Sequence, residues 1–561
     1  MEKLKSIKSL MPFVKPHVRI GLIGFLILQI YTILINVAPI ISKQLVEDLI
    51  TRISLQKLMK QLIMFSLVWL LQPVTSYLSS LMIIRFKERI VQELRNEFFK
   101  KVLYSPITVF EKSPPGTILT RILNETEEIG EFIQDLINNF TKNIIIIIFS
   151  FSIMLWLSPF LTVVLAMILF LFAVFILKKG HQIGILQKES QLLIDRMNTF
   201  VPSVIRNIVS INLNNAQNFI FNKFNEINSK LRDLSVQIFA KIMLLSTYTA
   251  LFAIVAIIII YVGGSIVIIN GHSTVGMIVA LSMYFQNLIA ASSELFDSGI
   301  EFRRLFPLIE RLNEFLLNNT NNIKIENTSE MLHFGELDFK IVIEDLWFKY
   351  ENSDSYVLQG INLIIEPNSI IGIIGESGCG KSTFLKLLCG LYKPERGSIT
   401  ICGKNISKID FREFWRYVSY IPQEAELIYN LSIRENIKLS NLNKVDNDIE
   451  NICEILKINK KIIKLPYGYD TMYDEKINFS GGEKQRILLA RELLKEAKIL
   501  LFDEPTSSLD EENERILCEI LKELKENRII IIVSHRKKIL EYADKIFTLN
   551  NGRLFEMNFT F

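Results

Sequence analysis

Repeated apolar runs, each long enough to cross a lipid bilayer, constrain this chain more than any other feature of its sequence. Three of them read IGLIGFLILQIYTILINVAPII, NIIIIIFSFSIMLWL and FLTVVLAMILFLFAVFIL, and all lie between about residues 20 and 300. A helix needs about 20 mostly apolar residues to span the hydrocarbon core. The last 220 or so residues instead alternate short apolar strands with charged helical stretches. We therefore predict a membrane-spanning first half and a soluble second half.

Six spans are predicted, and their lengths suit helices in a bilayer. They lie at about 19–41, 61–83, 143–157, 159–178, 246–269 and 275–298. The third is short, which leaves open an earlier start between Asp135 and Thr141. The predicted fold class is an all-α transmembrane domain of six helices, followed by an α/β domain.

The long segments 85–142 and 178–245 each carry about nine Lys or Arg residues, whereas the connection NGHSTVG after the fifth span carries none. Acidic and basic residues are costly at a bilayer centre, so both long segments must lie in water. The positive-inside bias places them in the cytoplasm. We therefore predict a multi-pass protein of the cytoplasmic (inner) membrane with both chain ends in the cytoplasm.

The domain boundaries follow from composition. Residues 1–18 carry basic residues among apolar ones, which predicts an amphipathic helix at the membrane surface, although a signal peptide is the competing interpretation. Residues 19–316 form the predicted transmembrane domain, in which the cytoplasmic segments are helical and turn near residues 114 and 212. The asparagine-rich stretch 317–337 is the predicted linker, and the α/β domain covers 338–561.

Charge and cysteine content exclude other classes. The net charge of +4 is small for 561 residues and gives no support to nucleic-acid binding. The five cysteines (379, 389, 402, 453 and 518) all lie in the soluble half without CxxC spacing. The absence of CxxC spacing suits reduced cytosolic thiols rather than disulfides or a metal site.

The stretch GESGCGKST has the GxxxxGK[ST] pattern of a phosphate-binding loop. It follows the buried-strand pattern IIGIIG and precedes the apolar helix pattern FLKLLCGL, which is the setting that phosphate binding needs. Lys381 can neutralise phosphate oxygens, and Ser382 can ligate Mg²⁺. A tight turn with a solvated lysine would explain neither flank. The predicted ATP-binding residues here are Gly375, Glu376, Ser377, Gly378, Cys379, Gly380, Lys381, Ser382 and Thr383.

Two further strand ends carry candidate catalytic groups. The run ILLFDEP predicts a central parallel strand, with Asp503 able to hold Mg²⁺ and Glu504 able to orient or deprotonate the attacking water. His535 follows the apolar run IIIIVS, where a neutral imidazole could hydrogen-bond a phosphate. Ligands bind at the carboxyl edge of such sheets. Taken alone, each motif is also compatible with an ordinary strand end.

The set of motifs resembles a half-transporter of the ATP-binding-cassette (ABC) superfamily, of the exporter type. The resemblance implies an α/β nucleotide-binding domain at 338–561, in which Tyr350 stacks on adenine. It also implies that Gln423 senses Mg²⁺ and touches the membrane domain, and that Asp510 in Ser508-Leu509-Asp510 crosses to the partner subunit. It assigns His535 as the switch histidine. In the membrane half, FEKSPPGTILTRILNE and INLNNAQNFIFNKF are similar to the two coupling regions of such exporters.

The stretch NFSGGEKQR resembles the family signature, formed by Ser480, Gly481, Gly482 and Glu483. A serine and two glycines at a helix N-terminus offer N–H groups to a phosphate. In the family this loop faces the phosphate loop of the other subunit. Glu483 stands where the commonest form has Gln, and 470–479 matches the exporter pattern only loosely.

The resemblance also implies cofactors and partners. We expect ATP and Mg²⁺, with the cation near Ser382, Gln423 and Asp503, and a homodimer rather than a heterodimer, because every catalytic position is filled. The expected cargo is a hydrophobic or amphipathic peptide, drug or lipid that is exported. An importer of the same fold, or an ATP-gated channel or sensor, is the alternative.

Polar residues within the spans are the candidates for a cargo path, since intramembrane polar groups are usually functional. Hydrogen bonding between helices is the equally weighted alternative. The candidate cavity residues are Gln29, Asn36, Ser282, Gln286 and Ser293.

Overall fold

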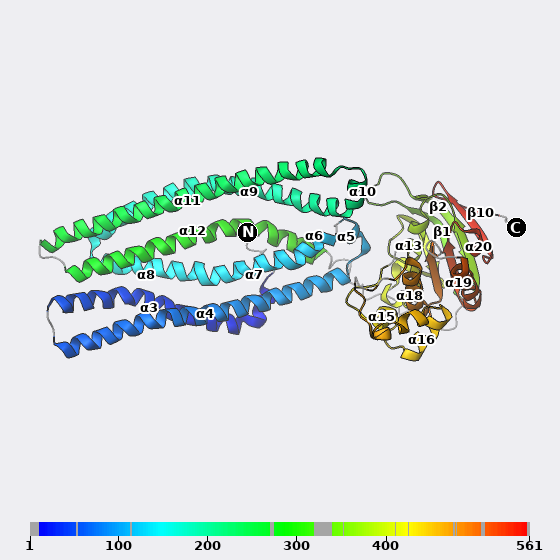
Figure 1. The fold of residues 1–561 in the computed structure, drawn as a ribbon, viewed down its shortest axis with the longest axis horizontal. Coiled ribbons are helices and arrows are strands. Elements are labelled where there is room, and N and C mark those ends of the chain that lie inside the picture. The colour runs from blue at the N-terminus through cyan, green and yellow to red at the C-terminus, as the bar shows by residue number, and fades with distance from the viewer. Residues whose placement is uncertain are drawn as a thin grey trace. The chain divides into compact units, whose positions relative to one another are not determined.

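A computed structural model describes residues 10–557, apart from 52–53, 113–114, 270–273, 319–338, 352, 410, 424–425, 475–476, 478 and 506–510 (Figure 1). The chain divides into two compact units. The helical unit comprises Met1–Ser105 and Ser113–Thr320, and the sheet unit comprises Pro106–Lys112 and Asn321–Phe561.

The described part of the helical unit is α-helical almost throughout. Its elements are α2 (Met11–Val14), η1 (Lys15–His17), α3 (Val18–Ile50), α4 (Leu55–Leu103), α6 (Pro115–Thr120), η2 (Arg121–Glu125), α7 (Thr126–Asp135), η3 (Leu136–Thr141), α8 (Lys142–Leu157), α9 (Pro159–Arg206), α10 (Ile208–Leu213), α11 (Gln217–Ile269) and α12 (Val275–Asn318). η2 and η3 are π-helical turns.

Within the described residues, six helical stretches are long and apolar enough to cross a membrane, which confirms the predicted number of spans. They are Met11–Ile50, Leu55–Leu103, Gly116–Leu157, Pro159–Arg206, Gln217–Ile269 and Val275–Phe296. The short third span is the end of a longer helical stretch, because η3 leads directly into α8.

The helices of this unit associate in pairs. α3 packs along α4, α9 along α11, and α12 against both α8 and α3 (Figure 1). Close approach of α3 and α4 depends on small residues: a Cβ at Gly24 would lie 3.0 Å from Ile83 Cγ1. Small residues let transmembrane helices approach closely. Tyr284 and Phe285 of α12 are fully buried in the core that α12 forms with α8, α9 and α11.

One of the two turns predicted in the long segments between spans lies among the described residues. α10 ends at Leu213 and α11 begins at Gln217, with Asn215 in the left-handed region (φ 52°), so the break predicted near residue 212 is confirmed. The break predicted near 114 falls on residues 113–114, outside the described residues.

Both predicted flanking segments are only partly described. The amphipathic helix predicted for residues 1–18 is described from residue 10, where α2 and η1 lead into α3. α12 continues to Asn318, and most of the predicted linker lies in the undescribed stretch 319–338.

The sheet unit contains the short helix α5 (Ile107–Lys112) and two sheets. The first sheet has the order β2-β1-β4-β5, from β1 (Ile341–Phe348), β2 (Leu358–Ile365), β4 (Arg396–Ile401) and β5 (Lys404–Asn405). The second has the order β10-β9-β3-β8-β7-β6, from β3 (Ser369–Ile374), β6 (Val418–Ile421), β7 (Ile499–Asp503), β8 (Ile529–Val533), β9 (Lys545–Asn550) and β10 (Arg553–Met557).

Helices and helical turns occupy the rest of the sheet unit. They are α13 (Lys381–Leu388), η4 (Ile406–Lys408), α14 (Phe411–Phe414), α15 (Ile433–Lys438), α16 (Asp446–Ile455), α17 (Asn459–Ile463), η5 (Gly468–Asp470), α18 (Gly481–Leu493), α19 (Glu511–Leu524) and α20 (Lys537–Leu540). The predicted strand before the phosphate loop is β3, and the predicted central strand before Asp503 is β7.

Strands β9, β3, β8, β7 and β6 run parallel. β7 and β8 are buried along their whole length, which explains their continuous apolar sequences, because a central parallel strand is covered on both faces. Alternate residues enter different cores: Ile499 and Leu501 pack with α13, whereas Leu500 and Phe502 pack with α18. The carboxyl ends of four neighbouring strands, β3, β8, β7 and β6, therefore lie at one edge.

Candidate nucleotide-binding and catalytic site

The phosphate loop joins β3 to α13 and is shaped by its glycines. Gly378 and Gly380 have φ angles of 82° and 106°, which L side chains rarely adopt. A Cβ at Gly375 would lie 2.4 Å from the carbonyl oxygen of Leu549, so only glycine fits there. The turn opens the first N–H groups of α13 toward a phosphate-sized ligand.

Lys381 lies inside this loop rather than in solvent. Its side chain is buried, and Nζ donates to the carbonyl oxygens of Gly375 (2.7 Å) and Glu376 (2.8 Å). A solvated lysine on a tight turn would not show these contacts. The ammonium group is held at the centre of the loop, where an anionic ligand would bring its negative charge.

Tyr350 lies beside the first turn of α13. Its hydroxyl shares a 2.8 Å hydrogen bond with Thr383 Oγ1, and its ring packs edge-on against Tyr392 and Phe348. The Tyr392 hydroxyl in turn donates to Glu111 in α5, the membrane-half segment that clusters with this unit. Burial and the Glu111 carboxylate raise the pKa of Tyr392 well above its ordinary value.

Asp503 at the end of β7 fits a bound cation. Its carboxylate is almost fully buried; Oδ2 accepts a 3.1 Å hydrogen bond from Tyr420, and Oδ1 has no partner among the described residues. A buried oxygen without a partner is costly unless a ligand completes it. Mg²⁺ prefers one or two carboxylates together with substrate phosphates. The residues present therefore fit Mg²⁺.

Three predicted catalytic side chains converge next to Asp503, each from a different strand end. Glu504 Oε2 accepts from Gln423 Nε2 at 2.8 Å, and its Oε1 lies 3.5 Å from His535 Nε2. Gln423 follows β6, Glu504 follows β7 and His535 follows β8. Glu504 has a positive φ of 49°, and its N–H donates to Val533 O. Such strain in a non-glycine residue is concentrated at functional sites.

A partly buried ion pair fixes the segment that carries His535. Arg536 donates from Nη1 to Glu514 Oε2 at 3.1 Å, and its N–H donates to Ser534 Oγ. Glu514 belongs to α19 and is buried. This pair anchors the end of β8, while His535 itself stays half exposed.

The signature residues form the capped start of α18. Ser480 Oγ accepts from Glu483 N at 3.2 Å, and Ser480 N donates to Glu483 Oε2 at 2.9 Å, which is a capping box. Lys461 lies 3.4 Å from the other carboxylate oxygen of Glu483. The acidic residue in place of the usual Gln therefore has a local structural role.

The described part of the atypical stretch 470–479 pairs with the segment after Gln423. Asn430 N donates to Tyr473 O at 3.0 Å, and Ile433 N donates to Thr471 O at 3.0 Å. Tyr473 stacks between Tyr429 (5.0 Å between ring centroids) and Phe479 (6.4 Å). Phe479 in this stack directly precedes Ser480, so this stretch connects α18 with the segment after Gln423.

Asp510, predicted for the partner contact, lies outside the described residues. Sequence reasoning missed Tyr420, the donor to Asp503, and Lys461, the cation beside Glu483. Strand alternation in VSYI could have indicated Tyr420, because it places this side chain on the same face as Val418. No signal in the sequence pointed to Lys461.

The candidate cavity residues lie in different surroundings. Asn36 is buried; its Nδ2 donates to Thr32 O, and its Oδ1 accepts from Ser150 of α8. Ser282 is also buried and donates to Val279 O. These two match the alternative of hydrogen bonding within and between helices. Gln286 is exposed, and Ser293 is partly buried.

Gln29 is partly buried, with Nε2 unpaired among the described residues. A charged group lies near Ser293: Glu294 accepts from Lys142 (2.8 Å) and Asn143 (2.9 Å) of α8. Pairing explains how a carboxylate is tolerated on a transmembrane helix.

Comparison with known proteins matches both halves of the chain. Residues 22–292 match the family model described as the ABC transporter transmembrane region, and residues 358–507 match the model described as ABC transporter. A Rickettsia typhi protein, named as an export ATP-binding/permease protein, is 28% identical over 92% of this chain and 88% of its own length.

Two further similarities extend over nearly the whole chain. An ATP-dependent lipid A-core flippase of Syntrophus aciditrophicus is 25% identical over 99% of this chain and 92% of its own length. The solved structure of a bacterial Atm1-family ABC exporter with ATP bound has a TM-score of 0.80 at 21% identity, covering 96% of this chain and 94% of that one. This structural likeness supports the fold.

Proposed function

The chain belongs to the ABC transporter family as an exporter half-transporter, and from this premise we propose that two copies together export a hydrophobic or amphipathic cargo. ATP hydrolysis drives transport in this family, and the matched ATP-binding and membrane regions place both activities in one chain. We assign the protein to the cytoplasmic membrane, with both ends in the cytoplasm.

The observation that carries this proposal is the cluster at the sheet edge, where Gln423, Glu504 and His535 meet. β7 and β8, which carry Glu504 and His535, continue in the same sheet to β3, which leads into the phosphate loop. A channel or sensor could dispense with a complete hydrolytic cluster. Its completeness here therefore favours turnover.

The residues act in a simple order. Lys381 and the N–H groups of the loop bind the phosphates of ATP, and Tyr350 stacks on the adenine ring. Glu504 orients and deprotonates the attacking water, and His535 contacts the terminal phosphate from the next strand end. Ser382, Gln423 and Asp503 would hold Mg²⁺, which when bound neutralises phosphate charge.

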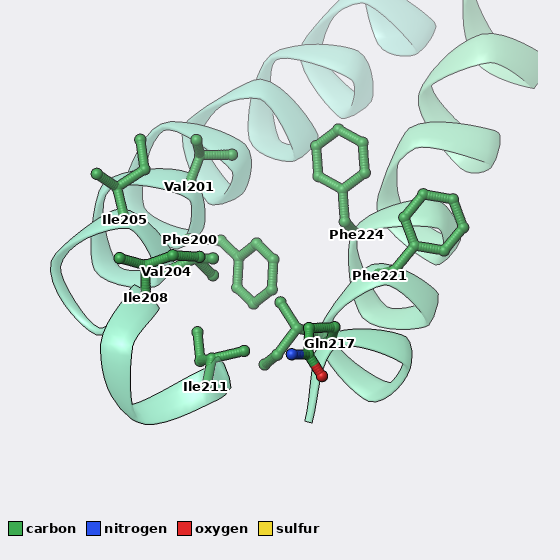
Figure 2. Close-up of a pocket in the computed structure, with 10 residues that line it drawn as sticks. Phe200, Val201, Val204, Ile205, Ile208, Ile211, Gln217, Phe221 and Phe224 are labelled. Carbon is green, nitrogen blue, oxygen red and sulfur yellow. The ribbon is translucent and has the colours of Figure 1, made fainter. Parts of the chain in front are cut away.

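The homodimer proposal rests on surfaces that a single chain leaves exposed. Figure 2 shows apolar side chains of α9, α10 and α11 around a shallow pocket at the turn near residue 212. Its lining includes Phe200, Val204, Ile208, Ile211, Phe221 and Phe224. Leu213 and Phe221 are 80% and 62% exposed, in a segment that the charge pattern assigns to water. Exposed apolar patches of this kind are typical of protein interfaces.

The signature supports the same assembly. Ser480, Gly481 and Gly482 begin α18 with exposed or half-exposed positions and can take a terminal phosphate. In the proposed homodimer, ATP lies between Lys381 of one copy and Ser480 of the other. Binding closes the pair, and loss of the terminal phosphate lets it reopen.

Transport by purified protein in inside-out vesicles tests the proposal. A panel of lipids, amphipathic peptides and hydrophobic drugs is screened for stimulation of ATPase activity, and the stimulating compounds are then followed across the bilayer. We expect ATP-dependent uptake into the vesicles and none with Glu504→Gln. Movement out of the vesicles, or uptake that this variant retains, would contradict ATP-driven export.

A further inference from the structure

Strand alternation places Tyr420 on the same face of the sheet as Asp503, the candidate cation ligand. In β6, Val418 and Tyr420 face the core around α13, and in β7, Ile499, Leu501 and Asp503 face the same way. The parallel register pairs Tyr420 with Leu501, one pleat before Asp503. The long phenol side chain can therefore extend along the strand direction to the carboxylate.

The contact between these two side chains is specific. Tyr420 Oη donates to Asp503 Oδ2 at 3.1 Å, and the tyrosine ring packs against the apolar core. The second oxygen, Oδ1, is buried and has no hydrogen-bond partner among the described residues. One oxygen is thus held by the protein, and the other has no protein partner among those residues.

We infer that Tyr420 is a positioning residue for the divalent cation: by holding Oδ2 of Asp503, it keeps Oδ1 directed to the metal. Second-sphere donors to a ligating carboxylate fix its rotamer and tune its affinity. This inference rests on the proposed function, since it assumes that Asp503 takes part in binding Mg²⁺ with the nucleotide.

The test compares nucleotide affinity with and without metal. The affinity of the full-length protein for AMP-PNP is measured in Mn²⁺ and in EDTA, and the ratio of the two affinities reports the metal contribution. Tyr420→Phe retains the ring and its packing but removes the donor. We expect this ratio to fall by about tenfold, because a hydrogen bond to a charged group is lost, while the affinity in EDTA stays the same.

Tyr469→Phe is the matched control. Tyr469 is a buried tyrosine that donates to Asn459 at 3.0 Å, in the helical part of the sheet unit. We expect its affinity ratio to equal that of the wild type. A purely structural role for Tyr420 would instead weaken both affinities equally.

Two results would overturn different statements. If the wild-type protein binds AMP-PNP more tightly in Mn²⁺ and Tyr420→Phe keeps the full ratio, the role of Tyr420 is wrong. If the wild-type ratio is itself one, the proposed cation site fails, whatever the variant does.

Discussion

Two glycine-containing loops, each at the start of a helix, differ in how they satisfy their own groups. In the phosphate loop, Gly380 is the N-cap of α13, has a left-handed backbone and supplies no side-chain cap. In the signature, Ser480 is the N-cap of α18, has an extended backbone (φ −62°, ψ 160°), and forms a complete capping box with Glu483. The N-terminus of α13 therefore has no side-chain cap, whereas that of α18 is capped by its own residues.

The charges differ in the same direction. Lys381 brings a buried positive charge to the first loop, whereas Glu483 brings a negative charge to the second. A chain of phosphates needs several donors and a counter-charge, which only the first loop provides. The signature can add only a few N–H groups. This difference agrees with the proposal that the signature assists a site at which a phosphate loop already binds the nucleotide.

The rate of ATP hydrolysis should depend on the catalytic residues at the sheet edge that also carries the phosphate loop. Glu504→Gln keeps the shape of the side chain but removes the base next to Gln423 and His535. General bases contribute about 10²- to 10⁴-fold, so we expect a loss of that order in the ATPase rate at saturating ATP, with ATP still bound. Steady-state hydrolysis and nucleotide binding measured on the same sample check this. A rate within about twofold of wild type would show that another group activates the water.

Initial binding should also depend on the phosphate loop. Lys381→Ala removes the only side-chain cation that the described loop contributes, and we expect ATP affinity to fall by about tenfold to a hundredfold. Binding of a fluorescent ATP analogue measures the change. Lys386→Ala is the matched control, because Lys386 lies on the same helix, one turn further on, and we expect no loss of affinity. Equal ATP affinities in Lys381→Ala and wild type would show that the phosphate loop does not need this cation to bind ATP.

Much of this architecture could be predicted from the sequence because the patterns involved are local. The buried runs before Gly375 and Asp503 became β3 and β7, and the apolar run before His535 became β8. Parallel topology then brings their ends together without further information. The six spans follow in the same way from their length and hydropathy.

Side-chain partners were less predictable, because they depend on register between distant segments. Tyr420 and Asp503 are 83 residues apart, and Asn36 and Ser150 are 114 apart. The sequence pattern around a polar residue in a span is the same whether its side chain faces a cargo or a neighbouring helix. The structure places Asn36 in the second class, and the sequence could not have distinguished the two.

The signature loop should affect closure more than binding. Ser480→Ala removes the oxygen that accepts from Glu483 N, which should cost about 1 kcal/mol in helix stability. We expect ATP-dependent association of two copies to weaken by about tenfold while ATP binding to the separate chain is unchanged. The concentration dependence of the association of two copies, measured with ATP in a Glu504→Gln background, reports closure. A fall in ATP affinity as large as that of Lys381→Ala would contradict the division of roles.

The smallest effect is expected from Glu483→Gln, which separates capping from charge. Glutamine can still accept from Ser480 N, so the capping box remains, but the pair with Lys461 and a negative charge near the phosphates are lost. Loss of the favourable charge at a helix N-terminus should lower stability by about 0.3 to 1 kcal/mol. Because the same charge repels a phosphate, we expect ATP-driven association to strengthen by about twofold.

Glu435→Gln is the matched control, since Ser432 and Glu435 form a second capping box at the start of α15. It should lower stability by a similar amount and leave ATP-driven association unchanged. Thermal unfolding and the ATP dependence of association, measured for both variants, separate the two contributions. If both variants change association equally, the effect of Glu483 is one of helix stability, and its charge has no influence on the phosphate that the signature receives.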